Sequence, residues 1–311
     1  MARIRPAYRA GPIRGKTVMS YRSVFRPNLF SGRVILVTGA GSGIGRCTAH
    51  ELTSLGATVA LIGRQSAPLE QTAAEIAEDG CVCSVFRCNI RKETLVRETV
   101  GTIINRHGRI DGLVNNAGGQ FPAPLAQISK KGWDAVIETN LTGGFLMARE
   151  CYTQWMAGHG GAIVNIVADM WMGMPGMGHS GAARAGMVSF TETAAAEWGP
   201  SGVRVNAVAP GWIASSGLDT YPEAMKKVIR TLPRHVPLGR LGNEAEVSAA
   251  IVFLLSEAAG FINGACLRVD GGAPNARRHW PLAEPAPAAR DQGFAGFHRA
   301  SPPALFSGDD A

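Results

Sequence analysis

Three glycines, Gly39, Gly43 and Gly45, have the spacing of residues that hold a phosphate group. They lie in VTGAGSGIGRCTAHEL, after a short apolar run and at the start of a segment with helical periodicity. The first glycine permits a tight turn, the second lets the backbone approach a pyrophosphate, and the third allows a helix to pack closely on a sheet. The free N–H groups at the helix start, around Ser42 and Ile44, are expected to face the phosphates. The stretch predicts a dinucleotide site, with a purely structural turn as the alternative.

The end of the next apolar run indicates which dinucleotide binds. Sites for NAD normally place Asp or Glu here, where the acid accepts hydrogen bonds from the ribose. The stretch LIGRQS instead places Gly63 and Arg64 at this point. A guanidinium binds a 2′-phosphate through charge-assisted hydrogen bonds, whereas an acid repels it. We therefore predict NADP(H), with NAD as the alternative if Arg64 is only a solvated surface residue.

Three later segments, each at the end of a predicted strand, supply the other expected cofactor contacts. CNI is expected to contact the adenine, NNAG to leave room for the adenosine ribose, and PGWIASS to hold the nicotinamide carboxamide. The residues concerned are Asn89, Ile90, Asn116, Ala117, Gly118, Pro210, Gly211, Ile213 and Ser215.

Strand and helix patterns alternate from Gly32 to about Gly272. Short apolar runs such as TVALIG are followed by helical segments such as PLEQTAAEIAEDG, with Pro near the start and Gly at the end. Near-continuous apolar strands are typical of a parallel sheet that is buried on both faces. The pattern predicts an α/β protein over residues 31–273, with a single doubly wound parallel sheet and helices on both faces.

Charge and cysteine content argue against several other classes of protein. The net charge is +7, but residues 1–18 carry five basic residues and no acid, so +2 remains without them. A nearly balanced core lacks the basic surface of a nucleic-acid-binding protein. No apolar run reaches the roughly 20 residues of a membrane span, and the six cysteines lack the spacing of a metal site or a disulfide framework. We expect no nucleic-acid partner, no membrane partner and no metal, with reduced thiols in the cytoplasm.

Both ends of the chain differ in composition from the predicted domain. Residues 1–30 are basic and without periodicity, and because Met19 opens MSYRSVF, residues 1–18 are interpreted as a misassigned start or a flexible arm. A mitochondrial presequence is the alternative, although its prolines and glycines would break an amphipathic helix. Residues 274–311 form an Ala/Pro-rich tail without periodicity and without a peroxisomal address.

The combination of TGAGSGIG, NNAG, the asparagine in ETNLTGGF, and PG after the sixth run resembles the short-chain dehydrogenase/reductase family over about residues 30–272. The resemblance implies a Rossmann-type fold, a nicotinamide cofactor and usually a homotetramer. It also implies a catalytic set of Asn, Ser, Tyr and Lys, of which Asn140 matches the first. This chain has Ser180 at the tyrosine position and Arg184 at the lysine position, where contact with the cofactor is also expected. NIVADMW lacks the usual serine and contains Asp169.

These departures change which reaction the site supports. Oxidising an alcohol needs a base for the hydroxyl proton, and a serine hydroxyl is far too weak an acid to replace an activated phenol. Reducing a C=C that is conjugated to a thioester needs hydrogen-bond donors that stabilise an enolate. The Ser180 hydroxyl and the Arg184 guanidinium are both donors. Asp169 is a candidate base or acid, unless it only caps the following loop, and His179 is another, unless it is a loop or interface residue.

Longer stretches favour the same chemistry. NNAGGQFPAPLAQISKKGWDAVIETNLTGGF and HSGAARAG resemble the peroxisomal trans-2-enoyl-CoA reductase branch of the family, whose relatives include 2,4-dienoyl-CoA reductases. That branch often has a tyrosine where this chain has Val188, so its phenolic donor is not carried over. CTAHEL, ADMWMGMPGMGHSGAARAGM and PGWIASSG are similar to bacterial short-chain dehydrogenases of citronellol catabolism.

We predict an NAD(P)-dependent oxidoreductase that transfers hydride from NADPH to a 2-enoyl-CoA, including branched or isoprenoid acyl chains. One alternative is an alcohol dehydrogenase of terpenoid catabolism that acts on citronellol or citronellal, with Asp169 as the base. A second alternative is a catalytically weak NADP-binding protein. The methionines between positions 170 and 187, with Trp171, are candidates for an acyl channel. The candidates for binding CoA phosphates are Lys226, Lys227, Arg234, His235 and Arg240.

Overall fold

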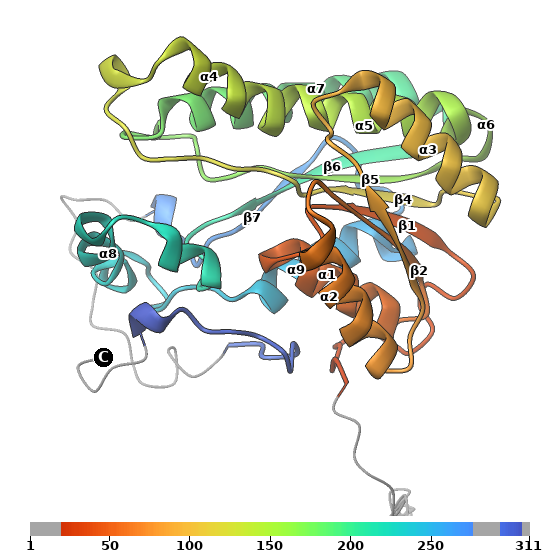
Figure 1. Ribbon diagram of the computed structural model, residues 1–311, viewed down its shortest axis with the longest axis horizontal. Helices are drawn as coiled ribbons and strands as arrows, with labels where there is room; N and C mark the ends of the chain where they lie inside the picture. Colours follow the sequence, from red (N-terminus) through yellow and green to blue (C-terminus); the bar gives the residue numbers. More distant parts are fainter. Residues whose placement is uncertain (1–19, 276–292, 307–311) are drawn as a thin grey trace, which may run out of the picture.

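The predicted apolar runs form one parallel sheet of seven strands, in the order β3-β2-β1-β4-β5-β6-β7 (Figure 1). The computed structural model describes residues 20–275 and 293–306, so the predicted arm, residues 1–18, and part of the tail, 274–311, lie outside the described residues. The strands are β1 Val34–Thr38, β2 Thr58–Gly63, β3 Cys83–Arg87, β4 Gly112–Asn115, β5 Gly161–Ile166, β6 Val203–Pro210 and β7 Cys266–Val269.

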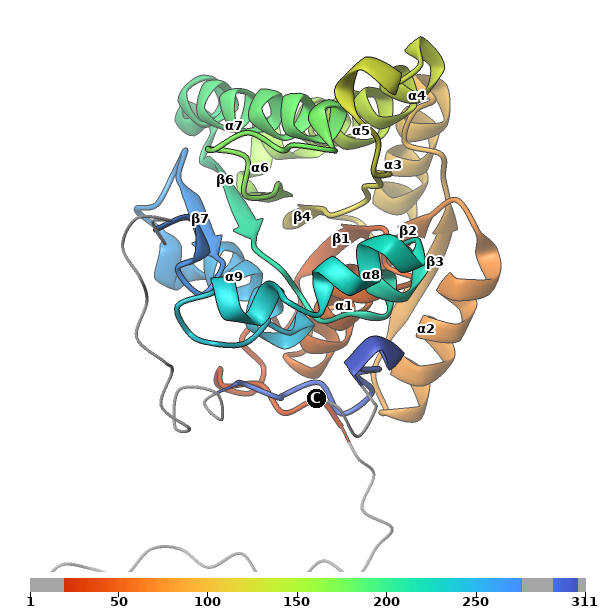
Figure 2. The same ribbon diagram turned by 90° about the vertical axis from the view of Figure 1, so that its left-hand side faces the viewer.

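Helices cover both faces of the sheet (Figures 1 and 2). The helices α3 to α7 lie on one face, and α1, α2 and α9 lie on the other, which confirms the predicted doubly wound parallel sheet. The helices are α1 Gly43–Ser54, α2 Ser66–Glu78, α3 Glu93–His107, α4 Lys130–Ile137, α5 Gly143–Cys151, α6 Ala157–His159, α7 Gly178–Trp198, α8 Glu223–Ile229 and α9 Glu244–Leu255.

The strand order reverses direction between β1 and β4. From β1 the chain builds outward through β2 to β3, and it then returns to place β4 on the other side of β1. In open parallel sheets, ligands bind at the carboxyl ends of the strands on either side of such a reversal. The predicted glycine turn follows β1 and the NNAG segment overlaps the end of β4, so the two lie on either side of the reversal, where a ligand crevice is expected.

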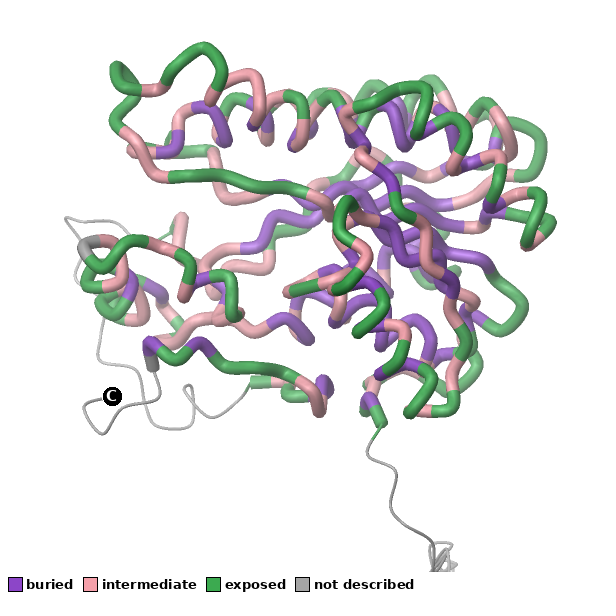
Figure 3. Tube along the Cα trace, in the orientation of Figure 1, coloured by how far each residue is buried: buried purple, intermediate pink, exposed green. Residues whose placement is uncertain are grey.

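Two apolar cores, one on each face, hold the sheet between its helices. All five residues of β1 are buried, and they alternate in direction: Ile35 and Val37 join the core under α1 and α9, while Val34 and Leu36 join the other core. Figure 3 shows buried positions concentrated along the strands. Burying each such side chain contributes about 1.5–3 kcal/mol, so the sheet is the rigid base on which the loops at its edge rest.

The described part of the tail, residues 293–306, is fixed to the domain by side-chain contacts. Phe297 is buried beside Tyr21, and Arg299 pairs with Glu78 and Asp79 of the α2 end. Further along, Leu305 is buried in a small core with residues around α8. The tail therefore links α1 and α2 to the segment that follows β6.

No helix within the described ranges is long and apolar enough to cross a membrane. All six cysteines are free thiols. In the part of the chain that the structure describes, no cluster of three or more His, Cys, Asp or Glu residues is arranged to hold a metal ion.

Candidate active site

The glycine turn between β1 and α1 has the shape that a bound pyrophosphate requires. Gly39 and Gly43 have φ angles of +68° and +52°, which favour glycine. A methyl group at Gly39 would lie 2.9 Å from the Ala117 Cα, and one at Gly45 would overlap the Gly39 carbonyl. At Gly43 the nearest atom to such a methyl group is Glu244 Oε1, at 4.0 Å, so this part of the turn is open. The residues present fit a dinucleotide cofactor.

Asn116 and Thr38 join the glycine turn to the NNAG segment. The Asn116 Nδ2 donates to the Thr38 carbonyl at 3.0 Å, and the Thr38 hydroxyl accepts the N–H groups of Asn116 and Ala117, both at 3.0 Å. Asn116 thus positions two segments of the crevice through its side chain. Its predicted contact with the cofactor stays a prediction.

Two arginines lie where the 2′-phosphate of NADP is expected. Arg64 follows β2 and is exposed, and Arg87, the last residue of β3, donates through Nε to the Arg64 carbonyl at 3.2 Å. Arg87 was not among the predicted site residues. Its position at the end of an apolar run could have indicated it, and the structure pairs it with Gly63 of the neighbouring strand. Asn89 lies nearby, and its Oδ1 accepts the Arg91 backbone N–H at 3.3 Å. Ile90 is buried.

The predicted nicotinamide segment is held between β7 and the residues before α9. The Gly211 N–H, directly after Pro210, donates to the Val269 carbonyl at 2.9 Å. Ile213 pairs with Gly242 as an isolated bridge. Ser215 follows and precedes a short 3₁₀ turn, Ser216–Thr220. The segment therefore lies at the carboxyl edge of the sheet, beside the crevice.

Asn140 and Arg184 both lie next to Gly118, which follows β4. Asn140 lies in a π-helical turn, Glu138–Thr142, a distortion that often marks a functional position. Its side-chain amide donates to the Gly119 carbonyl at 2.9 Å and accepts the Gly119 N–H at 2.8 Å. A methyl group at Gly118 would lie 2.5 Å from Arg184 Nη2 and 3.1 Å from Asn140 Oδ1. The structure thus brings together residues from three of the predicted motifs.

The Arg184 side chain reaches from α7 to the end of β5. Its Nη1 donates to the Ile166 carbonyl at 2.6 Å, and its Nε is enclosed without a hydrogen-bond partner among the described residues. Burial lowers the pKa of Arg184 to about 10. The guanidinium therefore remains charged near neutral pH, where it can donate hydrogen bonds but cannot serve as a base.

Ser180 is buried in the first turn of α7, and its hydroxyl is directed toward Gln120. The Ser180 Oγ donates to Gln120 Oε1 at 2.7 Å, and Gln120 Nε2 donates to the Tyr221 hydroxyl at 3.1 Å. His179 is also buried; its Nδ1 accepts the Ser180 N–H at 2.8 Å and its ring meets Phe121 edge to face. Gln120 and Tyr221 are site residues that the sequence did not indicate.

Asp169 lies at the carboxyl end of β5, close to a second carboxylate. Burial and the charge of Asp270 raise the pKa of Asp169, while Arg268 opposes this shift. The Trp171 backbone N–H also opposes the rise in this pKa, as the N–H of a capped loop would, yet Asp169 Oδ1 is buried without a partner among the residues described. Asp270 and Arg268 also line a hollow of about 500 Å³, whose lining does not include Asp169. Asp270 was not predicted, because it lies 101 residues further along the chain.

The other predicted substrate residues are divided between surface and core. Trp171 and Met172 are exposed beside Asp169, whereas Met177 and Met187 are buried. Two of the predicted cations have acidic partners, Arg240 with Glu246 and Lys226 with Glu223. The exposed cations are Lys227, Arg234 and His235.

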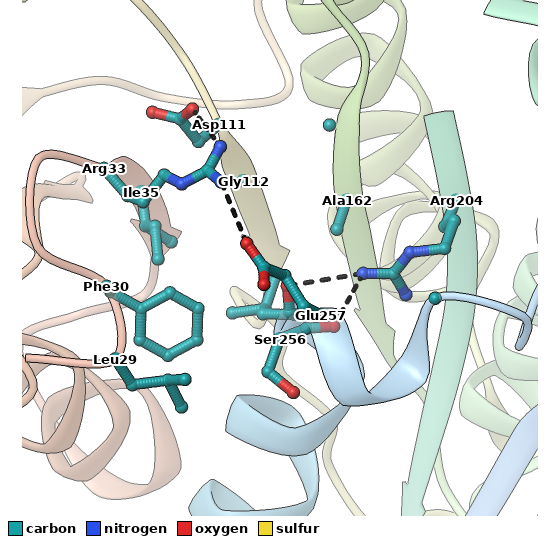
Figure 4. A pocket seen from close by; sticks show the side chains of 13 residues that line it. Leu29, Phe30, Arg33, Ile35, Asp111, Gly112, Ala162, Arg204, Ser256 and Glu257 are labelled. Atoms are coloured by element: carbon teal, nitrogen blue, oxygen red, sulfur yellow. Dashed lines mark hydrogen bonds and ion pairs between the residues drawn. The ribbon is translucent and has the colours of Figure 1, made fainter. Parts of the chain in front are cut away.

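A cavity of about 280 Å³ at the opposite, amino edge of the sheet has a different character (Figure 4). Arg33 pairs there with Asp111 and Glu257. Arg204 donates to the backbone carbonyls of Leu254 and Leu255 at the α9 end. These charged groups bind one another or the backbone, so we assign no catalytic role to this cavity.

We expect the stability of the protein to depend on pH through Glu244, which is buried beside the glycine turn. Burial raises its pKa from 4.5 to about 7. Its stabilising contribution is therefore fully present below pH 4.5 and is lost as the pH rises through about 7. We expect the Tm of the wild type, relative to that of Glu244→Gln, to fall by about 5 °C between pH 5 and pH 8. Thermal denaturation at both pH values measures this; Glu70→Gln, an exposed control, should show no such change, and a constant difference for Glu244→Gln would contradict the assignment.

Comparisons with known proteins agree with this architecture. The sequence profile of a family described as enoyl-(acyl carrier protein) reductase matches residues 39–274. A probable 2,4-dienoyl-CoA reductase of Bacillus subtilis is 37% identical over 244 residues, which cover 77% of this chain and 96% of the relative. A solved structure, a citronellol catabolism dehydrogenase of Pseudomonas aeruginosa, is 58% identical with a TM-score of 0.74, over 81% of this chain and 99% of the other. A putative NAD(P)-dependent gluconate 5-dehydrogenase of Beutenbergia cavernae with bound NADP is 31% identical with a TM-score of 0.74, over 80% and 100%.

Proposed function

The chain belongs to the short-chain dehydrogenase/reductase family of oxidoreductases, and from this premise we propose that it reduces the C=C bond of 2-enoyl-CoA thioesters with NADPH. The observation that carries the proposal is the charged Arg184, directed at Gly118 and Asn140 in a site where Ser180 replaces the expected phenol. A permanent donor suits a reaction in which negative charge develops on a thioester oxygen. The similarity to a probable 2,4-dienoyl-CoA reductase supports this substrate class.

In this proposal, different residues of the chain bind the cofactor and polarise the thioester carbonyl of the substrate. Arg64, with Arg87, supports the 2′-phosphate, and the open turn at Gly43 receives the pyrophosphate. NADPH, when bound, supplies the hydride that adds to Cβ of the substrate. The Arg184 guanidinium orients the nicotinamide end and stabilises the enolate oxygen. Asn140 keeps Gly118 and Gly119 in place beside that guanidinium.

The pair of carboxylates, Asp169 and Asp270, is proposed to deliver the proton that completes the reduction. Because the pKa of Asp169 is raised, this group holds a proton at a higher pH than an ordinary aspartate. A proton transferred from Asp169 to Cα of the enolate gives the saturated thioester. Solvent then restores the proton to the carboxylate.

The exposed side chains around the site support a CoA thioester with an apolar acyl chain. Trp171 and Met172 offer apolar surface next to Asp169, and the exposed Lys227 and Arg234 offer positive charge, and His235 a ring N–H donor, to the CoA phosphates. We further propose a homotetramer that works in the cytoplasm.

A direct assay tests the proposal. The protein with NADPH should lose absorbance at 340 nm when it receives a trans-2-enoyl-CoA with a straight or isoprenoid chain, and it should turn over citronellol with NAD⁺ or NADP⁺ at least about 100-fold more slowly. The saturated acyl-CoA should be the product by mass spectrometry. Tight NADPH binding without turnover of either substrate would instead support a catalytically weak NADP-binding protein.

A second candidate function is oxidation of a citronellol-like alcohol. The 58% identity to a citronellol catabolism dehydrogenase favours it. So does Asp169 Oδ1, which has no partner among the described residues, because an alcohol oxidation needs a base. Rapid turnover of citronellol that is lost in Asp169→Asn, together with inactivity on enoyl-CoA, would establish this function in place of the reductase.

A further inference from the structure

Three side chains form a hydrogen-bonded relay that starts at the position of the missing phenol. Ser180 comes from α7, Gln120 from the loop after β4, and Tyr221 from the segment that follows β6. The Ser180 hydroxyl donates to Gln120 Oε1 at 2.7 Å, and the Gln120 Nε2 donates to the Tyr221 hydroxyl at 3.1 Å. The Ser180 proton is thus already committed to a protein acceptor.

Because both bonds run in the direction from Ser180 to Tyr221, the hydroxyl proton of Tyr221 remains available for a hydrogen bond to a substrate. An amide has a carbonyl acceptor at one end and an N–H donor at the other, so Gln120 transmits the direction of donation from Ser180 to Tyr221. The Tyr221 oxygen accepts from Gln120, and among the described residues its own O–H has no hydrogen-bond acceptor. Accepting one hydrogen bond also makes a hydroxyl a better donor of its own proton.

We propose that Tyr221 is a catalytic residue whose O–H donates to the substrate's thioester oxygen, and that Gln120 is the positioning residue that aims it. The inference rests on the proposed enoyl-CoA reduction and names the donor that replaces the family's phenol. As hydride adds to Cβ, the electron pair of the C=C bond shifts to form an enolate, whose oxygen Tyr221 and Arg184 stabilise. Cα then takes the proton of Asp169, the donor proposed above, and the enolate becomes the saturated thioester.

The surroundings of Tyr221 fix its backbone without using its hydroxyl. Its ring packs against a small core formed by Leu218, Ile229 and Leu305. The Asp219 carboxylate accepts the N–H groups of Ala304 and Leu305, at 3.1 and 3.4 Å. The tail therefore holds the segment that carries Tyr221, and removal of the hydroxyl alone should leave this packing intact.

The isosteric variant Gln120→Glu tests whether the residue at position 120 must donate a hydrogen bond to the Tyr221 oxygen, or only has to connect Ser180 with Tyr221. A carboxylate still accepts from Ser180, and it also keeps a bond to Tyr221, but by accepting the phenol proton instead of donating to its oxygen. We expect Tyr221→Phe and Gln120→Glu each to lower kcat for a trans-2-enoyl-CoA by between about 10- and 100-fold, with the KM and the Kd for NADPH within about twofold of wild type. The double variant should be no slower than either, because the two residues act as one unit.

Tyr152→Phe is the matched control, since it removes a half-buried phenol that is bonded to Ser201 away from the site. It should leave kcat unchanged, and all variants should keep the wild-type Tm. If the wild type reduces the enoyl-CoA and Tyr221→Phe retains its kcat, or changes only the KM, the inference is overturned while the proposed function stands. If the wild type does not reduce the enoyl-CoA at all, the proposed function fails, and this inference fails with it.

Discussion

Replacement of Arg184 by alanine is expected to lower kcat/KM for a trans-2-enoyl-CoA by at least about 1000-fold. The side chain donates to the Ile166 carbonyl and places Nη2 against Gly118, so it supplies a fixed positive charge between the ends of β4 and β5. Its loss leaves the Ile166 carbonyl without this donor and removes a donor from the enolate. NADPH binding should also weaken, because the same guanidinium faces the nicotinamide end of the proposed site.

Steady-state kinetics and NADPH titration measure the effect, and Arg204→Ala is a matched control. Arg204 is another partly buried arginine that donates to backbone carbonyls, but it lies at the opposite edge of the sheet. Its removal should lower the Tm without a comparable loss of kcat. Arg184→Lys should retain part of the activity, since an ammonium keeps the charge but cannot reach the Ile166 carbonyl and the Gly118 side with two separate nitrogens. Wild-type kinetics in Arg184→Ala would remove this residue from the site.

Replacement of Arg64 by alanine is expected to weaken NADPH binding by about 100-fold and NADH binding by less than about threefold. The side chain is exposed after β2, at the point where an NAD site carries an acid, so its charge is available to a 2′-phosphate. The neighbouring Arg87 remains in the variant, which explains why some preference for NADPH should persist. Arg64→Glu should go further and reverse the preference in favour of NADH.

Fluorescence titrations with both nucleotides at low and high salt check this expectation. Arg97→Ala is the control, because it removes the same charge from an exposed position of α3. It should leave both dissociation constants unchanged. Equal weakening of NADPH and NADH in Arg64→Ala would mean that this residue does not distinguish the two cofactors.

The fold was predictable because the apolar runs and helical segments that specify it are short, continuous stretches of sequence. Each strand is a local apolar run, strands β2 to β6 lie between two helical segments, and such runs are stable in a sheet covered on both faces. The spacing of the glycines indicated a tight turn, and the positive φ angles at Gly39 and Gly43 agree with it. The pyrophosphate turn was therefore evident from a single stretch of sequence.

Parts of the candidate site were predictable where a motif carries its own geometry. Asn140, Gly118 and Arg184 were each indicated by a motif, and the structure brings them together. For Ser180, the sequence indicated a donor but not its acceptor, and the acceptor proved to be Gln120. For Asp169, the sequence left open a loop cap or a titrating group, and the structure shows features of both.

By itself, then, the sequence determined the sheet, the cofactor turn and the absence of a phenol at position 180. Only the tertiary structure decided which distant side chains face one another: Gln120 lies 60 residues from Ser180 and 101 residues from Tyr221, and Asp169 meets Asp270 from another strand end. Periodicity and turn chemistry act over a few residues along the chain. The meeting of these groups depends instead on a strand order that brings the carboxyl ends of β4, β5, β6 and β7 to one edge of the sheet.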